Sequence, residues 1–139
     1  MVTEDQVNEM VNVAIAARSN AYAPYSKYKV GAAVLAASGR IYAGANVENA
    51  SYGLTNCAER TAIFQAVSQG ERTLMALAVV ADSTPPVPPC GACLQVMAEF
   101  GIKLVIMANP QGAKIIRDFA AIFPVAFSGE VLPGGEQAG

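Results

Sequence analysis

Two hydrophobic periods run along this chain, one typical of helices and one typical of strands. Apolar side chains that recur every three or four positions, with Thr3 and Asn56 as candidate caps and Gly70 as a candidate terminator, indicate helices. Short runs of alternating or continuous apolar residues, many of them small or β-branched, indicate strands. The predicted helices span residues 3–21, 56–69, 91–99 and 118–122. The predicted strands span residues 28–36, 41–44, 74–81, 104–108 and 113–116.

This order of elements predicts an α/β fold in three α-β-α layers, with a mixed sheet of about five strands flanked by helices. We expect residues 1–132 to form a single domain. The glycine-rich residues 133–139 are expected to be a flexible tail. A polar segment at residues 46–53 separates a predicted strand from a predicted helix. Its composition alone fits either a binding loop or a turn stabilised by Asn and Ser.

Composition narrows the classes of function. Only 14% of the residues are charged while 53% are hydrophobic, which predicts that apolar surface is covered by other copies of the chain. The net charge is −2 and the nine Lys and Arg residues are scattered, which argues against a nucleic-acid partner. No apolar run reaches the length of a membrane span, and the acidic N-terminus does not resemble a signal peptide. A cytoplasmic location is therefore expected.

The three cysteines fall in two short segments, Cys57-Ala58-Glu59-Arg60 and Pro89-Cys90-Gly91-Ala92-Cys93. The spacing of Cys90 and Cys93 lets both thiolates reach one zinc ion at the start of a helix, and Cys57 can supply a third ligand. Helix N-termini beside the cysteines would lower the pKa of their thiols. Three protein ligands leave tetrahedral zinc one open position, as catalytic sites do. The chain contains no histidine, which excludes His-dependent catalysis.

Three other interpretations of the cysteines stay open on spacing alone. Cys90 and Cys93 could form a redox dithiol, although the residues around them differ from the thioredoxin pattern. All three could be buried thiols that act as small apolar side chains. A carboxylate, conceivably that of Glu59, could close a structural zinc site.

Taken together, these motifs resemble the zinc-dependent nucleoside deaminases, whose signature places a metal ligand two residues before a glutamate and ends in P-C-x-x-C. Segments 22–26, 30–33 and 46–52, together with Gln95, resemble the small homotetrameric cytidine deaminases. The resemblance covers residues 5–132. It implies hydrolytic conversion of cytidine and 2′-deoxycytidine to the uridine compounds with release of ammonia. It also implies a small-molecule nucleoside substrate and a homotetramer with shared sites.

Residue by residue, the resemblance implies one zinc ion per subunit on Cys57, Cys90 and Cys93. Zinc would lower the pKa of a bound water, and Glu59 would carry protons to N3 of the cytosine and to the departing amine. Tyr52 and Phe127 would reach a neighbouring subunit's site; ordinary core packing is the alternative for Tyr28 and Phe127. The residues implied to contact the nucleoside are Asn46, Glu48, Ala58, Tyr28, Tyr52 and Phe127. Arg60 and Gln95 would not contact zinc or the nucleoside themselves but would support the residues that do.

One position departs from the resemblance. Leu94 follows the last cysteine, where the family commonly has arginine, so Arg60 is left as the cation that tempers three thiolates. Two other functions stay open: deamination of a modified cytosine nucleoside, as in blasticidin-S deaminases, and a non-catalytic zinc-stabilised module. The second alternative does not require a glutamate beside an open metal position.

Overall fold

A five-stranded mixed sheet forms the middle layer of the protein, seen in a computed structural model that describes residues 1–133. The strands lie in the order β2-β1-β3-β4-β5, in which β3 and β4 are parallel and every other neighbouring pair is antiparallel. Their bounds are β1 Val30–Ala36, β2 Ile41–Ala45, β3 Leu74–Ala81, β4 Leu104–Ala108 and β5 Lys114–Asp118. The predicted fold class, a mixed five-stranded sheet flanked by helices, is confirmed.

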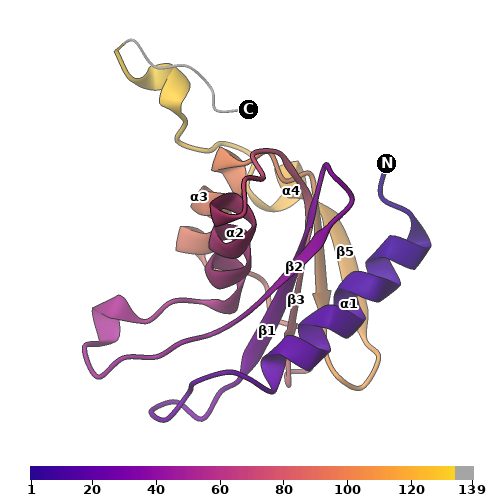
Figure 1. Cartoon of the computed structure of the whole chain (residues 1–139), viewed down its shortest axis with the longest axis vertical. Helices are drawn as coiled ribbons and strands as arrows, with labels where there is room; N and C mark the ends of the chain where they lie inside the picture. The colour runs from indigo at the N-terminus through magenta and orange to yellow at the C-terminus, as the bar shows by residue number, and fades with distance from the viewer. Residues whose placement is uncertain (134–139) are drawn as a thin grey trace.

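Helices cover both faces of this sheet (Figure 1). Helix α1 (Glu4–Arg18) packs against one face, and α2 (Ala58–Ser68) with α3 (Gly91–Glu99) packs against the other. The short α4 (Phe119–Ile122) follows β5. Two 3₁₀ helices, Tyr52–Leu54 and Gly129–Val131, were not predicted from the sequence.

The alternation of β1 divides its side chains between two cores. Ala32, Val34 and Ala36 pack under α2 and α3, whereas Ala33 and Leu35 pack under α1. This period of two is what a strand covered on both faces requires.

Two elements begin later than predicted because the backbone groups before them are hydrogen-bonded elsewhere. Strand β1 starts at Val30 and not at Tyr28, because the Tyr28 carbonyl accepts from Asn46 Nδ2 and the Lys29 carbonyl accepts from Arg18 Nε. Helix α2 is capped by Cys57 and not by Asn56. The backbone of residue 56 is instead paired with Val47, which keeps it extended.

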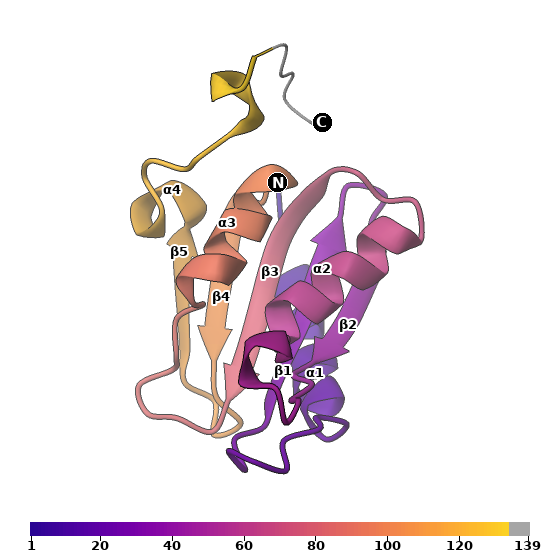
Figure 2. The ribbon, with the colours of Figure 1, turned by 90° about the vertical axis from the view of Figure 1, so that its left-hand side faces the viewer.

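The start of α2 and the start of α3 lie side by side at the same end of the sheet (Figure 2). Gly44 in β2 lets α2 pack closely on that strand, since a Cβ there would lie 2.3 Å from the Ala62 nitrogen. At the other end, the chain from Pro124 to Pro133 extends away from the body (Figures 1 and 2). Residues 134–139, most of the predicted tail, lie outside the described residues.

Candidate metal and substrate site

Three cysteine sulfurs meet where α2 and α3 begin. The Cys57 and Cys90 Sγ atoms are 3.8 Å apart, those of Cys90 and Cys93 are 3.4 Å apart, and all three lie within 4.8 Å of one another. Cys57 is the N-cap of α2, Cys90 is the N-cap of α3, and Cys93 lies in the first turn of α3. Two helix N-termini therefore present partial positive charge to the cluster.

The dimensions of this cluster fit zinc. Ligands at about 2.3 Å from a tetrahedral zinc ion are separated by about 3.8 Å, close to the spacing of these sulfurs. Cys93 is buried while Cys90 is exposed, so the cluster sits at the surface of the protein with one side accessible. Within residues 1–133, the His, Cys, Asp or Glu side chains that gather in a group of three or more, close enough together to hold a metal ion, are these three cysteines.

The thiols polarise one another. A hydrogen bond from Cys93, followed by one from the Arg60 guanidinium, holds the pKa of Cys57 at about 5. The pKa of Cys93 is raised, because its thiol donates a hydrogen bond to Cys57 and because it is buried. Arg60 Nη2 lies 3.4 Å from Cys57 Sγ. Cys57 is thus a thiolate at neutral pH, the form that binds a metal.

Glu59 stands in the first turn of α2 with only 5% of its surface exposed. Burial raises the pKa of its carboxyl group to about 7, and the charge of Cys57 adds to the rise. The preceding residue, Ala58, is fully buried, so it presents no accessible surface in the single chain.

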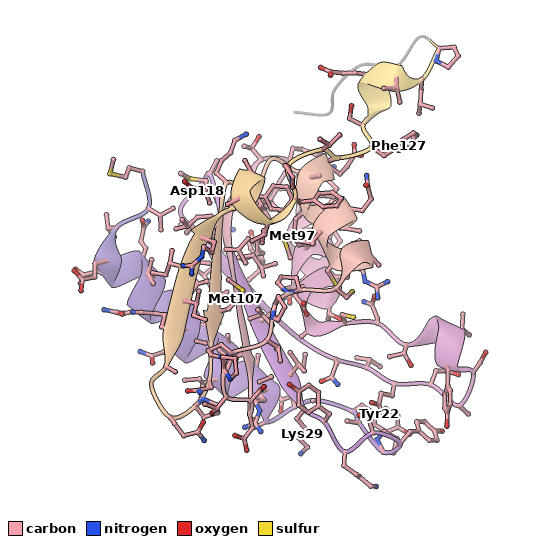
Figure 3. All side chains as sticks on the ribbon, turned by 180° about the vertical axis from the view of Figure 1, so that it is seen from behind. Tyr22, Lys29, Met97, Met107, Asp118 and Phe127 are labelled. Atoms are coloured by element: carbon pink, nitrogen blue, oxygen red, sulfur yellow. The ribbon has the colours of Figure 1, made fainter. Side chains whose placement is uncertain are left out.

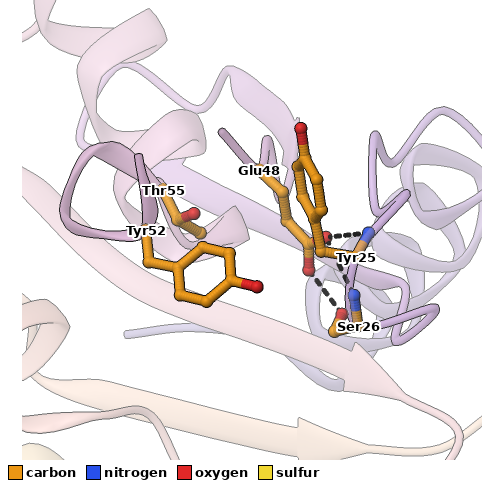
Figure 4. A pocket seen from close by; sticks show the side chains of 5 residues that line it. All are labelled: Tyr25, Ser26, Glu48, Tyr52 and Thr55. Carbon is orange, nitrogen blue, oxygen red and sulfur yellow. Dashed lines mark hydrogen bonds between the residues drawn. The ribbon is translucent and has the colours of Figure 1, made fainter. Parts of the chain in front are cut away.

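A pocket of about 370 Å³ lies beside the loop that leads into α2 (Figure 4). Its floor carries the Glu48 carboxylate, and the Tyr25 and Tyr52 rings flank it with centroids 6.0 Å apart. Ser26 and Thr55 complete the lining, and Thr55 precedes Cys57 by two residues. The pocket thus brings together Glu48 and Tyr52, two of the residues expected to contact a nucleoside.

Other expected contact residues do not line this pocket. The buried Asn46 side chain holds the backbone at the start of β1. It accepts a hydrogen bond from Val30 N and donates one to the Tyr28 carbonyl. The Tyr28 residue, whose carbonyl accepts this bond, is itself 40% exposed. Phe127 lies on the extended C-terminal segment, at the opposite end of the molecule from Tyr22 (Figure 3).

Gln95 holds that C-terminal segment. Its Nε2 donates to the Phe127 carbonyl at 2.7 Å, and Phe127 itself is 63% exposed. Gln95, which was expected to support the site residues, therefore contacts the segment that carries Phe127. Leu94, beside it, packs against the core formed by the sheet with α2 and α3.

Three residues of the pocket, Tyr25, Ser26 and Thr55, were missed as site residues by sequence reasoning. Ser26 and Tyr25 supply hydrogen bonds to Glu48 from 22 and 23 positions away. The available signal was the Tyr-Ser pair after Pro24, which marks a turn next to a strand.

Fold and cluster together define a three-layer α/β domain with a three-cysteine metal site and a buried carboxyl group beside it. Residues 4–109 match the family described as the cytidine and deoxycytidylate deaminase zinc-binding region, and the chain belongs to this family.

Relatives and solved structures agree with that assignment. The chain is 53% identical over 123 residues to a cytidine deaminase of Halalkalibacterium halodurans, covering 87% of this chain and 93% of the relative. It is 52% identical to one of Sporosarcina psychrophila over 128 residues, covering 91% and 94%. The crystal structure of cytidine deaminase from Burkholderia pseudomallei superposes with a TM-score of 0.82 at 48% identity, covering 86% of this chain and 98% of that one. No helix within residues 1–133 is long and apolar enough to cross a membrane.

Proposed function

We propose that the protein is a zinc-dependent deaminase that converts cytidine and 2′-deoxycytidine to uridine and 2′-deoxyuridine. The observation that carries the proposal is the convergence of Cys57, Cys90 and Cys93 beside the buried Glu59. Relatives that are more than half identical bear the name cytidine deaminase, which supports this substrate. A purely structural zinc site would not account for a buried carboxyl group beside a metal site with one accessible side.

Bound zinc would supply a Lewis acid that lowers the pKa of a water molecule at its open position. Glu59 accepts a proton from that water and delivers it to N3 of the cytosine, which makes C4 more electrophilic. The water oxygen bonds to C4, Glu59 takes the second proton from that oxygen and passes it to the exocyclic amine, and the C4–N bond breaks to release ammonia and leave a carbonyl at C4. The helix N-termini and Arg60 stabilise the negative charge of the thiolates throughout.

The proposal assigns the nucleoside's sugar to the pocket lined by Tyr25, Glu48 and Tyr52. Glu48 accepts from a sugar hydroxyl, and Asn46 fixes the adjacent backbone. We assign Tyr28 and Ala58 to the side of the pyrimidine base. Tyr52 and Phe127 are 76% and 63% exposed, and we assign both to contacts with another copy in a homotetramer. The three free thiols suit a reducing cytoplasm, where the enzyme would take part in pyrimidine salvage.

Glu59→Gln is the variant that tests this assignment. We expect it to retain about one zinc per chain and to lose activity by a factor of about 10³, because proton transfer is removed while the ligands remain. Cytidine turnover is followed by its ultraviolet absorbance and zinc by elemental analysis. Glu99→Gln, at the exposed end of α3, is the matched control and should behave as wild type.

Two results would contradict the proposal. Near-normal turnover by Glu59→Gln would remove the glutamate from the reaction. Failure of the wild-type, zinc-loaded protein to deaminate cytidine would contradict the substrate, and turnover of a modified cytosine nucleoside in its place would redefine it. A strong chelator should abolish activity and added zinc should restore it.

A further inference from the structure

The Ser26 hydroxyl is fixed between a donor and an acceptor. It accepts from the Tyr28 backbone nitrogen at 3.0 Å and donates to Glu48 Oε2 (Figure 4). Because a hydroxyl has a single hydrogen, this arrangement points that hydrogen at the carboxylate. The turn that sets it up contains Lys27 in the left-handed region at φ 61°.

The two oxygens of Glu48 are held in different ways. Oε1 accepts from the backbone nitrogens of Tyr25 at 2.9 Å and Ser26 at 3.1 Å, and these bonds do not depend on any side chain other than Glu48 itself. Oε2 is held by the Ser26 hydroxyl. The backbone pair therefore fixes one end of the carboxylate, and Ser26 fixes the plane in which the second oxygen lies.

This leaves little free acceptor capacity on Glu48. A carboxylate has about four acceptor positions, and the turn at Tyr25 and Ser26 fills three of them. The remaining position is on Oε2, in the pocket lined by Tyr25, Tyr52 and Thr55. The same hydroxyl lowers the pKa of Glu48 more than any other contact, which keeps this acceptor ionised.

We propose that Ser26 is a positioning residue for nucleoside binding: its hydroxyl orients Glu48 so that one acceptor on Oε2 faces a sugar hydroxyl. The inference rests on the proposed function. It predicts that Ser26 acts on binding through a single hydroxyl of the ligand. A merely structural serine would instead affect all ligands equally.

A second serine of the chain provides a matched control. Ser38 Oγ donates to Glu71 Oε2 at 2.7 Å and accepts from the Arg40 backbone nitrogen at 3.3 Å, which is the same two-position pattern on a different loop. Ser38→Ala therefore removes a comparable bond outside the site. Any loss of stability common to Ser26→Ala and Ser38→Ala is the general effect of deleting such a serine.

The experiment compares Ser26→Ala, Ser26→Thr and Ser38→Ala on cytidine and on its 2′-, 3′- and 5′-deoxy analogues. We expect Ser26→Ala to raise KM for cytidine about tenfold while kcat changes less than about twofold, since an ionic hydrogen bond is misdirected without touching the metal. Ser26→Thr, which keeps the hydroxyl, should restore KM. For the one analogue that lacks the hydroxyl read by Glu48, Ser26→Ala should change KM less than about twofold.

The outcomes separate the possibilities. Equal increases in KM for cytidine and every analogue, or an unchanged KM accompanied by the same drop in Tm as Ser38→Ala, would overturn the inference while the deaminase assignment stands. Failure of Ser26→Thr to restore KM, with normal folding, would also overturn it. A wild-type protein without activity on any cytosine nucleoside would overturn the proposed function and this inference with it.

Discussion

Within residues 1–133, the cationic side chain that donates a hydrogen bond to the cysteine cluster is that of Arg60. Its Nη2 donates to Cys57, while its buried Nε has no hydrogen-bond partner among these residues. Three thiolates on Zn²⁺ carry a net negative charge, which a nearby guanidinium offsets. Leu94 has an uncharged side chain that packs against the core, and it does not offset the charge of the thiolates.

Arg60→Gln should weaken zinc binding at neutral pH. Without the guanidinium the Cys57 thiol is harder to deprotonate, and metal binding requires the thiolate. We expect the zinc Kd to rise about 10- to 100-fold, the usual cost of losing a residue that supports a ligand. Competition with a chromophoric chelator measures it. Arg72→Gln is the control, because Arg72 Nη1 donates to the Val67 and Glu71 carbonyls and not to a cysteine of the cluster; equal zinc affinity in both variants would contradict the role of Arg60.

At the residue scale, the sequence predicted the cluster and Arg60 beside it, but not the hydrogen bonds made by Glu48 and by the Phe127 carbonyl. A spacing of three between Cys90 and Cys93 and the start of a helix at each segment are local features, so they could be seen in the sequence. The bond from Ser26 to Glu48 joins positions 22 apart through a left-handed turn at Lys27. Gln95 was expected to support the site residues, and it binds the Phe127 carbonyl, a contact that only the path of the C-terminal segment reveals.

At the scale of elements, α2 and β2 approach each other closely through Gly44. A Cβ at Gly44 would lie 2.3 Å from the Ala62 nitrogen and 2.9 Å from the Ala58 oxygen, which are backbone atoms that cannot move alone. The whole of α2 must shift to admit a methyl group. Since Cys57 caps α2, such a shift also displaces a proposed metal ligand.

Gly44→Ala should therefore lower the free energy of unfolding by about 1–3 kcal/mol, the usual cost of overpacking, and weaken zinc binding as well. Urea denaturation with and without zinc measures both effects. Gly53→Ala is the control, since no atom lies within 4 Å of a Cβ at that position. Stability as high in Gly44→Ala as in Gly53→Ala would show that α2 is not held tightly against β2.

Glu71 joins the end of α2 to the β1–β2 hairpin and should make stability depend on pH. The hydroxyl of Ser38, followed by that of Tyr42, lowers the pKa of Glu71 below its ordinary value of 4.5. Its stabilising contribution is thus fully present above that value and is lost as the pH falls through the lowered, folded-state pKa. Urea midpoints of wild type and Glu71→Gln should differ at pH ~7 and converge toward pH ~3; a difference that does not change with pH would contradict this coupling.

The elements themselves were largely predictable because their periods are local. Strands β3 and β4 and helix α3 have the predicted bounds, since each is a short apolar run or periodic segment with clear ends. The start of β1 was placed two residues early because side chains of Asn46 and Arg18 take the carbonyls that a strand would have used. The order of strands in the sheet depends on long-range pairing, which the sequence pattern did not specify.

At the scale of the whole molecule, exposed apolar side chains concentrate on the segments that carry the proposed intersubunit residues. Tyr52 and Leu54 on one loop are 76% and 70% exposed, and Val125 and Phe127 on the C-terminal segment are 87% and 63% exposed. These two segments lie toward opposite ends of one chain (Figures 1 and 3). If Phe127 contacts a site like the pocket at Glu48, it must do so in another copy, as the proposed homotetramer requires; sedimentation as a monomer would contradict the proposal.

Coexpression of two defective chains tests whether the sites are shared. Phe127→Ala alone should lower activity on dilute cytidine about tenfold, the effect of truncating a buried aromatic contact. In random tetramers of Glu59→Gln and Phe127→Ala chains, about one site in four combines an intact Glu59 with an intact Phe127 from another copy. Activity should then approach a quarter of the wild-type value. If Phe127 served the site of its own chain, every site would keep one defect, and activity would not exceed that of Phe127→Ala tetramers.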